Sequence, residues 1–200
     1  MTDAIDFYFD FSSPYGYLAA ERIEAVIAPF EREIRWRPIL LGAAFKTTGN
    51  KPLVDQPLKG DYTLHDLDRL ARFQQVPWVV PDPFPIATVR AARGFYWIDD
   101  QDPAAAVTFA KAVYRAYFGE GRNISEPDVV DGIAADLGHD REAFAAAVSS
   151  PEIKERLRNE VEASIERGVF GSPYMIVDGE PFWGADRFWM IKRWLKSGGW

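Results

Sequence analysis

Two neighbouring serines, Ser12 and Ser13, lie where an apolar stretch gives way to a proline, Pro14. A serine directly before a proline is an ordinary helix start, with the hydroxyl of Ser13 as the cap and Pro14 as the first helical residue. The same position could also stabilise an anion, because the first turn of a helix carries partial positive charge and unpaired N–H groups. A hydroxyl placed there can donate a hydrogen bond to a thiolate. The residues alone leave both interpretations open, and caps are the commoner of the two.

Other chemistry at Ser13 lacks the side chains that it needs. A serine nucleophile requires a general base, yet the two histidines, His65 and His139, have no recognisable triad context, and no Gly-x-Ser-x-Gly motif occurs. The chain has no cysteine, which excludes disulfides and thiol redox chemistry by its own side chains. Two distant histidines without cysteine make no metal-ligand set, so we expect no bound metal.

The composition is that of a globular protein whose main partner is neither nucleic acid nor an anionic membrane. The 200 residues are 48% hydrophobic, which is enough to bury a core as one domain or as one domain with a large insertion. A net charge of −7 opposes contact with anionic polymers and bilayers, which need a basic face. No apolar run reaches the length of a membrane span, and the acidic first residues do not resemble a secretory signal. We therefore expect a cytoplasmic protein.

The periodicity of the apolar residues changes twice along the chain. A strand over 5–10, a helix from Pro14 and an alternating strand over 34–39 predict a βαβ opening. Residues 41–58 have no clear periodicity and are expected to be irregular. Near the C-terminus, Asp178-Gly179 between two apolar runs predicts a hairpin of strands 174–177 and 181–183, with a last helix over about 185–196. Between the two ends the pattern predicts helices over about 63–75, 86–98, 103–118, 126–137, 141–149 and 151–167.

The order βαβ, helical block, ββα is that of the disulfide oxidoreductase DsbA and of the kappa-class glutathione transferases, in which a helical domain is inserted into a thioredoxin fold. Within that group the sequence resembles the bacterial 2-hydroxychromene-2-carboxylate isomerases. The matching stretches span nearly the whole chain, and their combination is specific although each alone is weak. They are DFYFDFSSPYGYLA (6–19), TGNKP (48–52), DLDRLAR (66–72), GVFGSP (168–173) and VDGEPFWGADR (177–187).

The resemblance implies an α/β fold, thioredoxin-like with a large all-helical insertion. Residues 1–40 and 168–200 would form the thioredoxin-like domain and residues 41–167 the insertion, and the family implies a homodimer. In the oxidoreductases the attacking cysteine directly precedes the proline, so its counterpart is Ser13, and that of the second redox cysteine is Gly16. With both sulfurs absent, dithiol exchange is impossible. The resemblance therefore favours Ser13 as a hydrogen-bond donor to the thiolate of bound glutathione, since free thiols titrate near ~8.5 and modest stabilisation suffices.

Two further pairs of residues are implied to bind glutathione. Ser172 precedes Pro173, whose counterpart in thioredoxin-like proteins is cis and faces the active loop, so the Ser172 backbone would pair with the cysteinyl part of glutathione. Without the resemblance this pair is a plain loop before a strand. The N–H of Ala185 and the carboxylate of Asp186, at the start of the last helix, would receive the γ-glutamyl end. An acid in the first turn of a helix is otherwise ordinary.

Residues around a polar turn complete the implied site. Asn50 would help to bind glutathione, although asparagine is also favoured in turns for its own backbone chemistry. Lys46 or Lys51 would meet a carboxylate of glutathione or of the substrate. Aromatic side chains could form a wall for the substrate: Tyr15, Phe182 and Trp183.

The leading hypothesis is a glutathione-dependent isomerase. It would convert 2-hydroxychromene-2-carboxylate, or a related aromatic catabolite, to trans-o-hydroxybenzylidenepyruvate and regenerate the glutathione. One alternative is a kappa-like glutathione transferase that acts on other electrophiles. The other is a non-catalytic thioredoxin-fold module that binds peptides beside the cis-proline.

Overall fold

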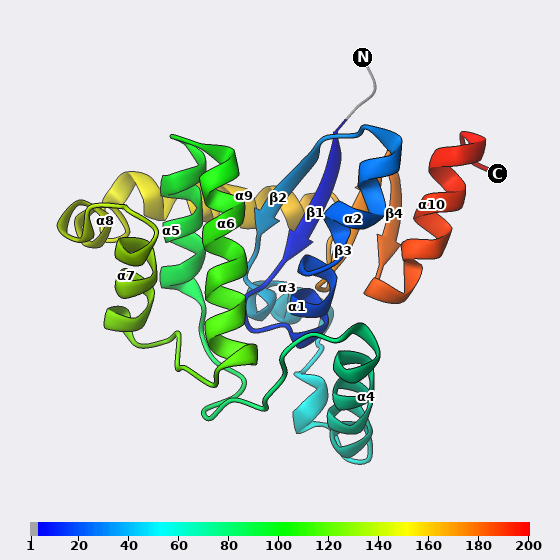
Figure 1. The fold of residues 1–200 in the computed structure, drawn as a ribbon, viewed down its shortest axis with the longest axis horizontal. Helices are drawn as coiled ribbons and strands as arrows, with labels where there is room; N and C mark the ends of the chain where they lie inside the picture. The colour runs from blue at the N-terminus through cyan, green and yellow to red at the C-terminus, as the bar shows by residue number, and fades with distance from the viewer. Residues whose placement is uncertain (1–3) are drawn as a thin grey trace.

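A four-stranded mixed sheet lies at the centre of the structure, a computed structural model that describes residues 4–200 (Figure 1). The strands are β1 (Ile5–Phe9), β2 (Ile34–Pro38), β3 (Tyr174–Val177) and β4 (Glu180–Trp183). Their order is β2-β1-β3-β4; β2 runs parallel to β1, whereas β3 is antiparallel to both of its neighbours. The two ends of the chain therefore contribute to one sheet, as predicted.

The helices fall into three groups along the sequence. Helices α1 (Pro14–Ala20) and α2 (Ile23–Ile27) form the crossover between β1 and β2. Between β2 and β3 lie α3 (Leu41–Thr48), α4 (Lys59–Gln74), α5 (Val89–Asp99), α6 (Pro103–Tyr114), α7 (Pro127–Asp136), α8 (Arg141–Ala147) and α9 (Pro151–Glu166). Helix α10 (Phe188–Ser197) follows β4. This order confirms a thioredoxin-like fold with a helical insertion, while its division at residues 40 and 168 stays a prediction.

Some bounds differ from the prediction where distant contacts decide them. Residues 41–48, expected to be irregular, form α3, whose first N–H, that of Leu41, donates to the carboxylate of Asp10 at 2.7 Å. This cap comes from the end of β1, and no local pattern could reveal it. The predicted helix over 103–118 is α6 followed by a π-helical turn, Arg115–Gly119.

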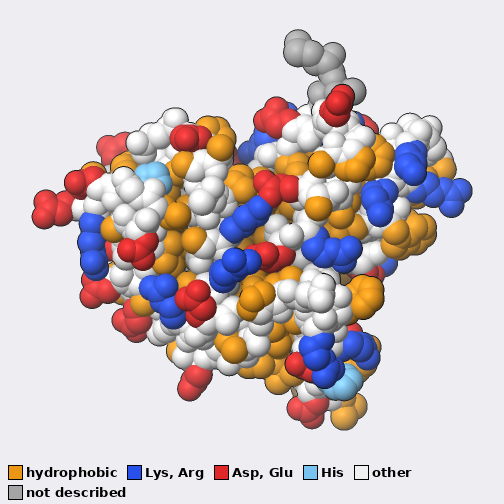
Figure 2. Space-filling view, in the orientation of Figure 1, with side chains coloured by type: hydrophobic (Ala, Val, Ile, Leu, Met, Phe, Trp, Pro, Cys, Tyr) orange, Lys and Arg blue, Asp and Glu red, His pale blue; other side chains and the backbone are white. Residues whose placement is uncertain are grey.

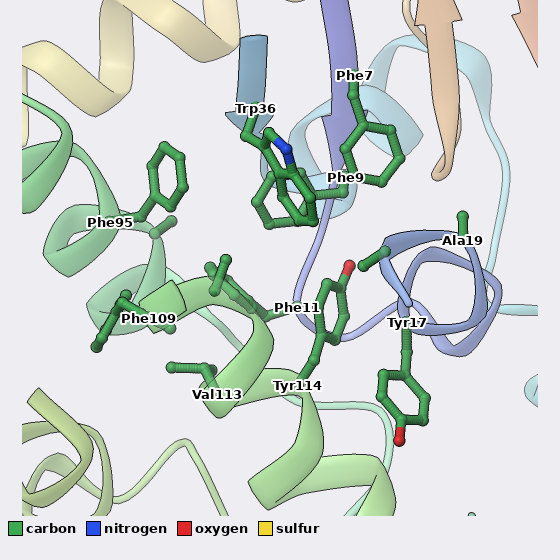
Figure 3. Close-up of a cluster of buried hydrophobic side chains, with 14 of the residues drawn as sticks. Phe7, Phe9, Phe11, Tyr17, Ala19, Trp36, Phe95, Phe109, Val113 and Tyr114 are labelled. Atoms are coloured by element: carbon green, nitrogen blue, oxygen red, sulfur yellow. The ribbon is translucent and has the colours of Figure 1, made fainter. Parts of the chain in front are cut away.

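Alternate residues of β1 face opposite sides of the sheet, as the period of a strand requires. Ile5, Phe7 and Phe9 are fully buried in the main core. The ring of Phe9 lies 5.8 Å from that of Phe95 on α5 and 5.7 Å from that of Tyr114 on α6, between centroids (Figure 3). The sheet and the inserted helices therefore share one core.

On the other side of β1, Asp6 is the centre of an ionic network with α9. Arg37 of β2 binds Asp6 at 2.7 Å and Glu160 of α9 at 3.1 Å. Arg167, which directly follows α9, binds the second oxygen of Asp6 at 2.7 Å. Burial alone would raise the pKa of Asp6, but the hydrogen bonds and charges of the two arginines hold it below its ordinary value. The network fastens α9, which passes behind the sheet in Figure 1, to β1.

The surface carries charges of both signs. Figure 2 shows acidic and basic side chains interspersed over one face, with basic side chains gathered over α10 at the right. Within residues 4–200, no helix combines the length and the apolar character that crossing a bilayer demands.

Candidate active site

Ser13 caps α1 and contacts the loop that precedes β3. Its oxygen accepts a hydrogen bond from the N–H of Gly16 at 3.0 Å, and its hydroxyl donates to the carbonyl of Ser172 at 2.9 Å. The residue is buried, with 5% of its surface exposed. The helix-cap interpretation is therefore confirmed. To donate to a sulfur from outside, the hydroxyl would have to turn away from the Ser172 carbonyl, and that role stays a prediction.

The loop opposite Ser13 contains a cis peptide bond between Ser172 and Pro173, as the resemblance implies. The hydroxyl of Ser172 accepts a hydrogen bond from the N–H of Asp10 at 3.0 Å. The carbonyl of Pro173 accepts one from the N–H of Gly184 at 3.0 Å. These bonds bring together three segments that are far apart in the sequence: the loop after β1, the cis-proline loop and the turn after β4.

Asp10, which was not predicted to belong to the site, holds the active loop, residues 10–13 between β1 and α1, in place. Its carboxylate accepts hydrogen bonds from the N–H of Ser12 at 2.8 Å, the N–H of Leu41 at 2.7 Å and the hydroxyl of Thr88 at 2.8 Å. Its carbonyl accepts one from the hydroxyl of Tyr114 at 2.8 Å. Burial raises the pKa of Asp10, although the three donors act in the opposite direction. The position of Asp10 between Phe9 and Phe11 at the end of a strand was the sequence signal that could have indicated its role.

Gly16 stands where the oxidoreductases have their second cysteine, and the space beside it is already filled. A Cβ atom on Gly16 would lie 2.6 Å from the hydroxyl oxygen of Tyr114 and 2.7 Å from that of Ser172. Such distances are well inside van der Waals contact. Burial raises the pKa of Tyr114 well above its ordinary value, so the phenol keeps its proton at neutral pH. Two hydroxyls thus occupy the place of a second sulfur.

Tyr15 connects α1 to α4. Its hydroxyl donates to the carboxylate of Asp66 at 2.9 Å, and Asp66 also pairs with Arg69. Burial, and after it the hydrogen bond to Asp66, raises the pKa of Tyr15 well above its ordinary value. The phenol is therefore a neutral group that already has an acceptor, and its contact with a substrate stays a prediction.

Lys46, Asn50 and Lys51 are exposed around the far end of α3. The helix begins at Leu41, which is bonded to the active loop, and ends at Thr48, followed by the cap residue Gly49, whose φ is 73°. Its eight residues span about 12 Å, similar to the reach of about 10 Å of an extended tripeptide. The geometry is thus compatible with a tripeptide that extends from the loop toward these polar groups, whose roles stay predictions.

Ala185 and Asp186 lie in a 3₁₀ turn, Ala185–Arg187, and not in the last helix. The helix predicted over about 185–196 thus consists of this 3₁₀ turn followed by α10 from Phe188, so Ala185 and Asp186 precede the α-helix. Asp186 is exposed and pairs with Arg187 at 2.6 Å. An ammonium group of a ligand would therefore compete with a neighbouring guanidinium for this carboxylate.

Phe182 and Trp183 face opposite sides of β4. Phe182 is buried in the main core, where its ring centroid lies 6.0 Å from that of Trp194. Trp183 is 55% exposed and packs against Phe170, with 4.8 Å between ring centroids. Of Phe182 and Trp183, both predicted to contact the substrate, only Trp183 presents much ring surface to a ligand.

The assembled site offers hydrogen-bond donors without a protein nucleophile. The hydroxyls of Ser13 and Tyr114 both have acceptors, and the carboxylate of Asp10 at the loop is buried. His65 is exposed on α4, and His139 lies beside the ring of Trp97 on α5. Within the described part of the chain, no cluster of acidic or histidine side chains could hold a metal ion. Covalent chemistry at this loop would need a nucleophile from a bound molecule.

The chain is similar to known proteins over nearly its whole length. Residues 4–196 match the family of the DSBA-like thioredoxin domain. The chain is 35% identical over 190 residues to the 2-hydroxychromene-2-carboxylate isomerase of Pseudomonas putida, which covers 94% of this chain and 92% of the relative. It is 33% identical over 197 residues to the protein of the same name from Sphingobium xenophagum, with 98% and 99% covered. It is also 27% identical over 199 residues to glutathione S-transferase kappa 1 of Caenorhabditis elegans, with 94% and 88% covered.

The fold is also similar to that of solved structures. A 2-hydroxychromene-2-carboxylate isomerase superposes with a TM-score of 0.88 at 33% identity, covering 97% of this chain and 95% of the other. The cytosolic disulfide reductase DsbM from Pseudomonas aeruginosa, solved with GSH, superposes with a TM-score of 0.65 at 18% identity, covering 98% and 93%. The second likeness shows a shared fold alone.

Proposed function

The chain belongs to the DSBA-like thioredoxin family and, within it, to the 2-hydroxychromene-2-carboxylate isomerases, and on that basis we propose that it isomerises 2-hydroxychromene-2-carboxylate or a related aromatic catabolite with glutathione as cofactor. The product would be trans-o-hydroxybenzylidenepyruvate. One observation carries the proposal: Ser13 stands at the N-terminus of α1 beside a cis-proline, in a chain without cysteine. A redox loop whose sulfurs are replaced by a serine and a glycine needs its thiol from another molecule.

The donor set at the loop suits a thiolate. The N-terminus of α1 contributes partial positive charge, and the hydroxyl of Ser13 is a donor that can turn toward a sulfur. The space beside Gly16 is closed by the hydroxyls of Tyr114 and Ser172. A ligand thiol would thus lie on the outer side of the Ser13 loop.

The remaining parts of glutathione find partners of suitable chemistry in the proposed site. The backbone of Ser172 can pair with the cysteinyl residue in the manner of a β-strand. The N–H of Ala185 and the carboxylate of Asp186 suit the two charges of the γ-glutamyl end, and Gly184 bonds their turn to the cis-proline. At the end of α3, Asn50 would bind glutathione, whereas Lys46 and Lys51 suit a carboxylate of glutathione or of the substrate.

When bound, glutathione would supply the thiolate that adds to the unsaturated carbon chain of the substrate and leaves it after the former double bond has rotated. The protein's own part is to position the reactants and to stabilise charge. Ser13 donates to the sulfur, which lowers the pKa of the thiol without any proton transfer to the serine. Asp10 and Tyr114 keep the loop that carries Ser13 in one conformation. Trp183, which is exposed, and Tyr15 would contact the aromatic ring of the substrate.

Turnover of 2-hydroxychromene-2-carboxylate, followed by absorbance, tests the proposal. Protein freed of glutathione should be inactive, and added glutathione should restore activity. S-methylglutathione, which keeps the shape but has no thiol, should not restore activity and should compete with glutathione. Isomerisation at the same rate without glutathione would refute the cofactor, whereas no isomerisation with glutathione present would refute the substrate.

A kappa-like transferase is the second candidate, because the kappa relative is 27% identical and matches 94% of this chain. Conjugation of glutathione to a halogenated aromatic, measured beside the isomerase assay, distinguishes the two activities. The third candidate, a peptide-binding module, predicts an intact fold that does not bind glutathione in calorimetry. We also propose a homodimer in the cytoplasm by analogy with the family, and light scattering after gel filtration tests the dimer.

A further inference from the structure

A pocket lies in the helical insertion, at the start of α5 and α7 and the end of α8, and contains none of the residues proposed above for the active site. Its volume is about 310 Å³. This is at the lower end of the range for small-molecule sites. The lining combines apolar, cationic and hydroxyl groups, among them Val89, Val148, Arg90, Arg93, Ser125 and Ser149.

Its two arginines, one turn apart on α5, differ sharply in their partners. Arg90 makes a two-point contact with Asp131 on α7, in which both N···O distances are 2.7 Å. Arg93 donates a single long hydrogen bond, of 3.4 Å, to the carbonyl of Val148. Among residues 4–200, the buried Nε atom of Arg93 has no hydrogen-bond partner, and no carboxylate pairs with this side chain. Arg90 is thus neutralised within the protein, whereas Arg93 is not.

The guanidinium of Arg93 therefore lacks a counter-charge. Burial lowers the pKa of Arg93, and no acidic neighbour offsets that effect. Arginine nevertheless remains protonated in proteins, so the charge is present at neutral pH. Buried charges are nearly always paired, so an arginine that lines a pocket without an acid is an exception, and a ligand at its outer nitrogens would balance its charge.

The start of α7 adds to the positive character of the pocket. Pro127, the first residue of this ten-residue helix, lines the pocket, and the residue before it, Glu126, makes no side-chain cap. The first turn does contain an acid, Asp128, but Arg141 binds it at 2.9 Å. The helix end contributes partial positive charge beside Arg93, which the exposed carboxylate of Glu126 offsets in part.

We propose that this pocket binds an organic carboxylate with a small apolar body. The carboxylate would meet the outer nitrogens of Arg93 in the two-point geometry that guanidinium groups favour. The hydroxyls of Ser125 and Ser149 donate to Asn123 Oδ1 and to the carbonyl of Ala145, so each would have to turn from that acceptor to donate to the carboxylate. Val89 and Val148 would contact the apolar part of the ligand.

The pocket and the active loop meet at one segment of the chain. Ala87 and Val89 line the pocket, whereas Thr88 between them donates to Asp10 in the active loop. Because an aromatic acid could also enter the active site, the test must report on the pocket itself. The Nε–H group of Arg93 provides such a report in two-dimensional NMR.

Titration of the full-length protein with benzoate tests the proposal, with benzamide as the uncharged isostere and inorganic phosphate as the simple anion. Benzoate should shift the Arg93 Nε–H signal and the Ser125 and Ser149 amide signals in a saturable manner, with a Kd on the order of 1 mM. Benzamide should not shift them. If phosphate binds with the same affinity as benzoate, the proposal that the site selects a ligand with an apolar body is contradicted.

Three variants complete the experiment. Arg93→Gln should weaken benzoate binding at least about tenfold, because a charge-assisted contact is lost, and Arg93→Lys should retain part of the affinity. Arg158→Gln, a change of an exposed arginine on α9, should leave binding unchanged. Melting curves show whether each variant is folded. If Arg93→Gln is unfolded, the affinity of Arg93→Lys and the titration of the wild type still decide whether benzoate binds at Arg93. Equal affinity of a folded Arg93→Gln, or no saturable shift in the wild type, overturns the proposal.

Discussion

Replacement of Asp10 by asparagine tests whether this carboxylate holds the active loop. One of its oxygens accepts from the N–H of Ser12 and the hydroxyl of Thr88, and the other accepts from the N–H of Leu41. In Asp10→Asn one of these oxygens becomes an NH₂ group, which cannot accept. With the remaining oxygen on the side of Ser12, the new NH₂ group faces the N–H of Leu41, and two donors meet at the start of α3.

The size of the effect follows from this geometry. A buried donor left without its acceptor costs about 1–3 kcal/mol. Burial raises the pKa of Asp10, which means that the ionised carboxylate itself is costly to bury. The neutral asparagine avoids this cost, which offsets part of the loss. We expect a loss of about 2 kcal/mol, which corresponds to a decrease in Tm of about 4–8 °C for a chain of this length. Turnover should fall about 10- to 100-fold, because a misplacement of about 1 Å at a reacting group costs that much.

Melting curves and isomerase kinetics should be measured on the same samples of Asp10→Asn. Asp68→Asn, a change of an exposed aspartate on α4, is the control and should stay within about 0.5 kcal/mol of the wild type. If Asp10→Asn melts and turns over like this control, the carboxylate does not hold the loop, and the reasoning fails.

Three further changes test other parts of the structure. Ser13→Ala should lower turnover by up to about 10²–10³, and by more than Ser12→Ala at equal stability; the reverse order would show that the wrong serine is assigned. Asp186→Asn should weaken glutathione binding with near-normal turnover at saturation, and unchanged affinity in calorimetry would remove Asp186 from the site. Asp6→Asn should lower stability at neutral pH. The pKa of Asp6 is lower in the folded protein than in the unfolded chain, so the ionised carboxylate stabilises the fold above the unfolded-state pKa, and this stabilisation is lost as the pH falls through the folded-state pKa. The free energies of unfolding of wild type and variant, measured in urea, should therefore converge below about pH 4.

The parts of the fold that local patterns determine were predictable from the sequence. The hairpin is one example, because Asp178 and Gly179 both adopt positive φ, 53° and 85°, which this dipeptide tolerates well. The start of α1 is another, since Ser13 and Pro14 are a cap and a first helical residue in the structure as in the pattern.

The parts that long-range contacts determine were not predictable from one sequence. Asp10 caps α3 across 31 residues and binds Thr88 across 78, and Tyr114 reaches its carbonyl across 104. None of these spacings has a periodic signature, so α3 was expected to be irregular and Asp10 was overlooked. The burial of Phe182 was also not predictable. Alternation along β4 predicts that Phe182 and Trp183 face opposite sides of the sheet, but not which side α10 covers.

The ionisation of glutathione bound to this protein tests the central claim most directly. The chain has no cysteine, so any thiolate absorbance that appears on titration belongs to glutathione. Burial raises the pKa of Tyr17 to about 12 and that of Tyr114 well above its ordinary value, which keeps these phenols from contributing near neutral pH. We predict that the thiol of bound glutathione titrates below the value of about 8.5 for a free thiol, and that Ser13→Ala moves it back toward that value. A bound thiol that titrates like free glutathione in the wild-type protein would contradict the account.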